Sequence, residues 1–263
     1  MAEYLQYDWK AHVISRDLIH EVPFRKTKID HNSCILGLRN LVQQSSDAEF
    51  KNTQKQDDAT LLKFLYARRF DVLDAHQLLQ NYYWYRKRNE EIFKNFTIKS
   101  GDIFKALENG LPGVLDCRDR KGRTVIIMDT NNWDCSYNLI INNVTNQATG
   151  FVVIVDWTEF SFRQSTNLKP GILKLMIEGL QDCFPARFKG IHFIGQPWFV
   201  NAALTVIKPF LKDKMKERIY VHGNNLSTLH DYVPKDILPA EMGGEQPSYN
   251  PHDWLKNLTE QKP

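Results

Sequence analysis

Four short apolar segments constrain the fold more than any other feature of the chain. They are VIIM (125–128), FVVIVDW (151–157), IHFI (191–194) and IYVH (219–222), and β-branched and aromatic residues dominate them. They lack the alternation of apolar and polar residues that a half-exposed strand would have. Such runs are typical of strands that are covered on both faces in a mainly parallel sheet. Because helix-like segments separate the strands, we expect an α/β fold with right-handed crossovers.

The segments between the last three strands predict helices. After the second strand, Pro170 stands near the first turn of an apolar helical pattern that runs to Leu180. Before the fourth strand lies WFVNAALTVIKPFLKDKMKERI (198–219), which is apolar at its start and strongly basic at its end. A buried helix needs no cation cluster, and a solvated helix needs no apolar run, so this segment combines two different surfaces.

The first part of the chain predicts a helical unit. Asp57 or Asp58 can cap a helix with a buried stripe around Phe64, and Asp71 can cap a second helix that ends in a basic turn at 86–88. We therefore expect these divisions: a helical or flexible segment at 1–56, a small all-helical domain at 57–96, an α/β domain at 97–256 and a tail at 257–263.

Composition excludes several classes of function. The formal net charge of +3 is too small for a general nucleic-acid binder, so any anionic partner must meet a local patch. The four cysteines are scattered without a C-x-x-C pair, which argues against a zinc site and a disulfide framework. The start of the chain lacks a secretory pattern, and no apolar run approaches the ~18 residues of a membrane span. We expect a cytoplasmic protein that needs no metal and no cofactor.

Catalytic signatures are also missing. The sequence has no G-x-S-x-G elbow, no Walker loop, no G-x-G-x-x-G and no H-E-x-x-H. Asp156 late in the second strand, His192 inside the third and His222 beside Gly223 are the polar candidates. A structural role is favoured for each, because no spacing implies a dyad or triad. We therefore predict no catalytic residues, and an α/β hydrolase-like enzyme is the least favoured alternative.

Several motifs resemble those of the CRAL-TRIO family of lipid-binding proteins, and most of all its clavesin branch. The motifs cover most of residues 57–256 in family order: DDATLLKFLYARRFD, LLQNYYWYRKR, GLPGVLDCRDRKGR, GFVVIVDW, IEGLQDCFPARFKGIHFIGQPW, IKPFLKDKMKERIYVHGNN and ILPAEMGG. The resemblance implies a helical N-terminal domain beside a lipid-binding α/β domain, whose apolar cavity is closed by a mobile gate helix at roughly 197–211. Pro209 should kink or break this helix.

The resemblance also implies site residues. A hydrophobic ligand, tocopherol-, retinoid- or phospholipid-like, would contact cavity and gate residues: Ile154, Trp157, Phe160, Phe162, Ile177, Leu180, Ile194, Phe199, Ala203, Val206, Ile207 and Phe210. A basic patch would bind phosphoinositide head groups through Arg68, Arg187, Lys189, Lys214 and Arg218. Such a protein would associate peripherally with endosomal or trans-Golgi membranes. An alternative is a trafficking adaptor with a vestigial cavity that recruits coat proteins.

One segment departs from the family pattern. Between NWD (132–134) and GFVVIV (150–155), relatives usually carry a longer connection that contains a helix, whereas this chain has CSYNLIINNVTNQAT. The shorter connection can still form a parallel crossover. We expect a helix that packs on the sheet to be lost or truncated there.

Overall fold

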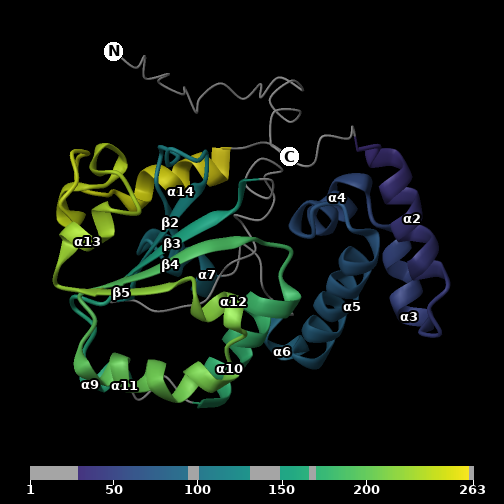
Figure 1. Cartoon of the computed structure of the whole chain (residues 1–263), viewed down its shortest axis with the longest axis horizontal. Helices are drawn as coiled ribbons and strands as arrows, with labels where there is room; N and C mark the ends of the chain where they lie inside the picture. The colour runs from purple at the N-terminus through teal and green to yellow at the C-terminus, as the bar shows by residue number, and fades with distance from the viewer. Residues whose placement is uncertain (1–28, 94–100, 131–148, 166–169, 261–263) are drawn as a thin grey trace, which may run out of the picture.

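The computed structural model describes residues 29–93, 101–130, 149–165 and 170–260, in two packed parts (Figure 1). A helical unit stands at one side, and an α/β part with a central sheet forms the rest of the molecule. The shortened connection at 135–149 lies almost wholly outside the described residues, so the prediction of a lost helix stays a prediction. Within the described part of the chain, no helix is long and apolar enough to cross a membrane.

The helical unit is built from capped amphipathic helices. Its elements are α2 (His31–Gln43), α3 (Ala48–Lys51), η1 (Asn52–Lys55), α4 (Asp58–Ala67), α5 (Val72–Arg88) and α6 (Glu90–Phe93). Asp57 caps α4 by accepting a hydrogen bond from the Thr60 N–H at 2.6 Å, and Asp71 caps α5 through the Asp74 N–H at 3.0 Å. Helices α2, α4 and α5 share one buried apolar cluster that includes Leu38. The helical core therefore also includes α2, which precedes residue 57.

The sheet follows the order β1-β2-β3-β4-β5, with β1 antiparallel to β2 and all other pairs parallel. Its strands are β1 (Gly113–Val114), β2 (Thr124–Asp129), β3 (Phe151–Asp156), β4 (Phe188–Ile194) and β5 (Ile219–Gly223). All four predicted apolar segments form strands, and the predicted mainly parallel α/β fold is confirmed. Strands β2 and β3 are buried almost throughout, as the absence of alternation predicted.

Helices cover both faces of the sheet (Figure 1). One face carries α9 (Phe162–Ser165), α10 (Pro170–Glu178), η3 (Gly179–Cys183), α11 (Trp198–Ile207), η4 (Lys208–Phe210) and α12 (Asp213–Lys216). The remaining elements are α7 (Gly101–Glu108), α13 (Leu226–His230), η5 (Lys235–Ile237), η6 (Ala240–Met242) and α14 (Pro251–Glu260). Helix α11 ends at Ile207, and Pro209 lies in the 3₁₀ turn η4 that follows, so the predicted break is confirmed.

The helical unit packs on the α/β part through α5, which contacts both α10 and η3. The Asn81 side-chain amide donates to the Asp182 carbonyl oxygen at 3.0 Å, and the Tyr85 hydroxyl donates to the Leu175 carbonyl oxygen at 3.1 Å. Segment η3 is a π-helical turn, an element that often marks functional positions in helices. It therefore links the helical unit to the face of the sheet that carries α10 and α11.

Candidate functional site

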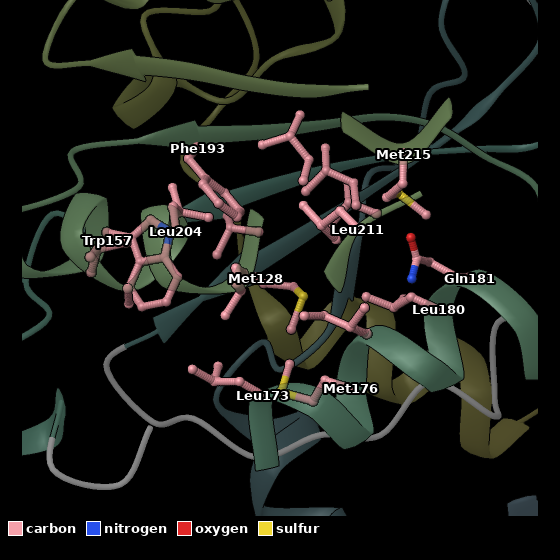
Figure 2. Close-up of a pocket in the computed structure, with 18 residues that line it drawn as sticks. Met128, Trp157, Leu173, Met176, Leu180, Gln181, Phe193, Leu204, Leu211 and Met215 are labelled. Carbon is pink, nitrogen blue, oxygen red and sulfur yellow. The ribbon is translucent and has the colours of Figure 1, made fainter. Parts of the chain in front are cut away.

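An apolar cavity lies between the sheet and the layer formed by α10 and α11 (Figure 2). The sheet contributes one wall, and helices α10 and α11, with the segment after α11, contribute the others. The lining residues are Met128, Val153, Val155, Trp157, Leu173, Met176, Ile177, Leu180, Gln181, Ile191, Phe193, Val200, Ala203, Leu204, Ile207, Leu211, Met215 and Ile219. Gln181 is the one amide among them, and no lining residue in the described part of the chain carries a charge.

The volume of this cavity indicates what it can hold in the conformation described. It encloses about 120 Å³, similar to an engineered apolar cavity of about 150 Å³ that binds benzene. A longer lipid would need one wall to move outward. Helix α11 is the wall best suited to move, because Val200 is its one fully buried residue and much of its outer side is exposed.

Five of the predicted cavity and gate residues line the cavity: Trp157, Ile177, Leu180, Ala203 and Ile207. Phe160 and Phe199 pack against the same core cluster. Phe160 makes an edge-to-face contact with Trp157, and Phe199 makes one with Phe162. The prediction also placed Ile154 and Ile194 at the cavity, and here it must be corrected. Both residues are buried in a separate cluster with Leu229, because successive residues of a strand point to opposite faces of the sheet.

The outer side of the gate region is apolar and exposed. Phe162 and Trp198 stack with ring centroids 6.3 Å apart, and they expose 62% and 73% of their surface. Val206 and Phe210 are likewise exposed, at 63% and 59%. We call these four residues the outer gate face. They do not line the cavity, although the prediction placed Phe162, Val206 and Phe210 there.

The segment after the gate is held by consecutive residues of η3. The Gln181 side-chain oxygen accepts from the Lys212 N–H at 2.6 Å, and the Gln181 amide nitrogen donates to the Phe210 carbonyl oxygen at 3.3 Å. Next to it, Asp182 forms an ion pair with the Lys212 ammonium group. The turn that contacts the helical unit thus also holds residues 210–212, which end the predicted gate and which we call the hinge.

A cluster of cations lies where β4 and β5 begin, close to this hinge in the sequence. Burial, together with the charges of Arg69 and Arg218, lowers the pKa of Arg187 to about 10. Burial also lowers the pKa of Lys189 to about 8, and Arg187, Arg218, Arg69 and Lys214 act in the same direction. Neighbouring cations lower one another's pKa values because they repel, and a bound anion would reduce this repulsion. We call these five residues the basic cluster.

The structure brings together four of the five predicted head-group residues and adds one that was not predicted. Arg69 has a left-handed backbone (φ 56°) in the turn after α4, and its charge acts on Arg187 and Lys189. Arg68, the predicted residue of this turn, instead experiences the carboxylates of Asp74 and Asp182, which oppose the lowering of its pKa by burial. The sequence could have indicated Arg69 as well, because it is the second of the two adjacent arginines in the YARRF motif from which Arg68 was chosen.

The lowered pKa of Lys189 predicts a pH-dependent affinity for polyphosphorylated head groups. Lys189 is largely charged at pH 7 and largely neutral at pH 9, whereas a bound phosphate would keep it charged. Binding then takes up a proton, and the affinity for a soluble inositol trisphosphate should fall about tenfold from pH 7 to pH 9 relative to a Lys189→Arg variant, which meets the same ionisation of the ligand's phosphates. Isothermal titration calorimetry measures this. A Lys189→Arg variant stays charged and serves as the control; an equal decline in both proteins would contradict the assignment.

The polar candidates for catalysis have structural partners. The Asp156 carboxylate accepts from the Thr158 N–H at 2.9 Å and from the Thr158 hydroxyl at 2.5 Å, which stabilises the turn after β3. His192 and His222 form a stacked pair with 3.0 Å between Nδ1 of the first and Nε2 of the second. Both observations agree with the structural roles that the sequence favoured.

The hydrogen bonds of the histidine pair run in one direction. With the Thr228 hydroxyl donating to the Asn225 carbonyl oxygen at 2.8 Å, His222 Nδ1, 2.7 Å from this hydroxyl, is the donor. His222 Nε2 then accepts from His192, whose pKa is lowered to about 3 mainly by burial. The chain of donors ends at a backbone carbonyl instead of a reacting group. Among the described residues, no group of three or more His, Cys, Asp or Glu could hold a metal ion.

A mostly parallel sheet with an apolar cavity under its helices, next to a helical N-terminal unit, defines an α/β protein suited to lipid binding. The chain belongs to the CRAL-TRIO family, a family of lipid-binding and transfer proteins: residues 108–244 match the CRAL/TRIO domain and residues 26–81 match the CRAL/TRIO, N-terminal domain. The resemblance predicted from the sequence motifs is thereby confirmed.

Individual relatives agree with this assignment. Clavesin-1 of Rattus norvegicus is 44% identical over an alignment of 235 residues, with 84% of this chain and 66% of the relative covered. Clavesin-2 of Homo sapiens is 43% identical, with 84% of this chain and 71% of the relative covered. The chain thus spans about two thirds of the length of these relatives. The crystal structure of Sfh5 matches 87% of this chain and 92% of its own with a TM-score of 0.51 at 13% identity, a likeness of fold.

Proposed function

We propose that this chain is a non-catalytic carrier of a hydrophobic ligand that docks on phosphoinositide-containing membranes. One observation carries the proposal: a single segment borders both the apolar cavity and the basic cluster. Met215 lines the cavity, while the adjacent Lys214 and the nearby Arg218 belong to the cluster. A head group at the cluster and a lipid in the cavity would therefore act on the same short stretch of chain.

The gate in this proposal is α11 with η4. Its inner side contributes Ala203, Leu204 and Ile207 to the cavity. The outer gate face carries the exposed side chains of Phe162, Trp198, Val206 and Phe210. Exposed aromatic and aliphatic side chains gain free energy by entering the interface of a bilayer. Contact with a membrane would stabilise the outward position of the gate, in which a ligand can enter or leave.

The basic cluster supplies the selectivity for the membrane. A phosphorylated inositol head group is a concentrated anion, and each cation near an anionic surface contributes about 1 kcal/mol. Lys189 and Arg187 are half-buried and lie close to other cations of the cluster. A multivalent phosphate group bound at this point would reduce the repulsion among these cations more than the spread-out charge of an ordinary anionic membrane would. Such lipids would direct the protein to endosomal or trans-Golgi membranes as a peripheral protein.

The alternative is a trafficking adaptor that recruits coat proteins and leaves the cavity empty or vestigial. The almost wholly apolar lining of the cavity favours a carrier. The hydrolase alternative needs a nucleophile beside a base, and the polar groups discussed above instead bond to the backbone and to one another.

Lipid transfer between vesicles tests the proposal. Donor vesicles would contain a mixed neutral-lipid extract, and acceptor vesicles would contain either phosphatidylinositol bisphosphate or phosphatidylserine at equal total charge. We expect transfer to the bisphosphate acceptors to be faster, together with co-purifying lipid in an organic extract of the protein. A purified protein without lipid that transfers none to either acceptor would favour the adaptor.

A further inference from the structure

We infer that Asp182 is a latch for the gate: its carboxylate holds the hinge through Lys212 while the gate is closed, and it pairs with Arg68 of the helical unit when the hinge moves away. The inference rests on the proposed function, in which α11 and η4 move, and it adds a regulating contact to that function. Three features support it: the position of Asp182, the surroundings of Arg68 and the exposure of Lys212.

Asp182 contacts the hinge and the helical unit at the same time. Its carboxylate forms the ion pair with the Lys212 ammonium group, and its backbone carbonyl oxygen accepts from the Asn81 amide of α5 at 3.0 Å. An ion pair between Arg88 of α5 and Glu178 of α10 adds a contact to the helical unit just before η3. Because these contacts hold the backbone, the carboxylate can exchange partners by rotation of its side chain alone.

Arg68 is a second cation whose charge interacts with this carboxylate. It is the C-cap residue of α4, and its half-buried side chain forms no hydrogen bond or ion pair within the part of the chain that the structure describes. Burial lowers the pKa of Arg68, and the charges of Asp74 and Asp182 act in the opposite direction. A guanidinium group that has lost part of its water gains from a carboxylate partner. Arg68 is therefore an alternative partner for Asp182.

Lys212 stands where an anionic membrane would compete for it. Its side chain exposes 65% of its surface, whereas that of Asp182 exposes 31%. Along the chain it lies between Phe210 of the outer gate face and Lys214 of the basic cluster. When the outer gate face enters a bilayer, lipid phosphates meet the Lys212 ammonium group, and an exposed ion pair is weak enough to be exchanged. Asp182 then pairs with Arg68, and the hinge stays released.

Hydrogen exchange of the backbone amides at 207–212, measured by mass spectrometry on the full chain without vesicles or added lipid, tests the latch. We expect an Asp182→Asn variant to exchange about fivefold faster, because the ion pair that opposes local opening is gone. A Lys212→Gln variant should show the same effect. An Arg68→Gln variant should exchange as slowly as the wild type or more slowly, because Asp182 then has no second partner.

The response to salt separates the latch from a contact that only supports the fold. Salt screens the exposed pair with Lys212 more than the half-buried site at Arg68, so exchange in the wild type should quicken between about 0.05 M and about 0.5 M sodium chloride. The Asp182→Asn variant should lack this response. A Lys208→Gln variant, changed at an exposed cation of the same segment, is the control and should behave as the wild type does.

Three results would overturn the latch: unchanged or slower exchange in the Asp182→Asn variant, faster exchange in the Arg68→Gln variant, or equal salt responses in the Asp182→Asn variant and the wild type. None of them bears on the carrier function, because no lipid takes part in the measurement; lipid transfer by the wild type judges that function separately. Circular dichroism and thermal unfolding establish that the variants are folded. If Asp182→Asn does not fold, the exposed substitution Lys212→Gln gives the same comparison.

Discussion

Reversing the charges of Lys189 and Lys214 together is expected to weaken binding to vesicles that contain phosphatidylinositol bisphosphate about 1,000-fold. Each cation near an anionic head group contributes about 1 kcal/mol, and each reversal both removes that attraction and adds a similar repulsion. Two reversals therefore cost about 4 kcal/mol, which corresponds to roughly three orders of magnitude in affinity. Vesicle flotation or surface plasmon resonance with the Lys189→Glu, Lys214→Glu double variant measures the loss.

The matched control changes the net charge equally at exposed positions outside the cluster. Lys105 on α7 and Lys235 on η5 are both exposed, so a Lys105→Glu, Lys235→Glu variant has the same total charge. We expect it to retain binding to within about threefold, because charges beyond a Debye length are screened. Equal losses in both double variants would show that net charge, and not the cluster, binds the membrane.

The same variants give a second readout through stability. Burial is the main cause of the lowered pKa values of Lys189 and Arg187, and repulsion from the other cations of the cluster adds to it in the folded state. Charge reversal at Lys189 introduces an attraction to these neighbours, so the unfolding temperature should stay the same or rise. A marked fall would mean that lost binding reflects a damaged fold.

The sequence predicted the strands and the end of α11 well because those features are local. An apolar run such as FVVIVDW can scarcely be anything but a buried strand, and Pro209 ends α11 through its own ring and missing N–H. The family motifs then supplied the order of the elements and the likeness to the clavesins.

The orientation of residues within those strands could not be predicted in the same way. A strand that is buried on both faces has no polar residues to mark which positions face which side. Val153 and Val155 line the cavity, whereas Ile154 between them belongs to the opposite core. Ile154 and Ile194 were placed at the cavity wrongly because the strands show no alternation of apolar and polar residues that would mark the two faces of the sheet.

Arg69 and Gln181 were missed for a different reason. The position of Arg69 depends on the left-handed turn after α4, and that of Gln181 depends on the π-helical turn at η3. Neither backbone conformation follows from the local residue types, since arginine has no preference for positive φ. Such residues meet their partners only when the helical unit, the hinge and the sheet have packed together.

Filling the cavity from the gate separates ligand binding from membrane docking. Ala203 lines the cavity, whereas Ala202, one residue earlier on α11, is exposed. An Ala203→Trp variant would place an indole in a space of about 120 Å³, and we expect the bound lipid to fall at least tenfold. Filling a void offsets part of the overpacking, whose usual cost is about 1–3 kcal/mol, so the protein should remain folded.

The Ala202→Trp variant adds the same side chain to the outer surface of the same helix. It should retain wild-type amounts of lipid, measured by mass spectrometry of an organic extract, because the indole does not enter the cavity. Both variants keep the basic cluster, so both should still bind bisphosphate vesicles. If Ala203→Trp carried as much lipid as Ala202→Trp, the ligand would have to lie elsewhere. If Ala203→Trp lost lipid and membrane binding together, docking would depend on the loaded cavity, and gate and cluster would then form one coupled site.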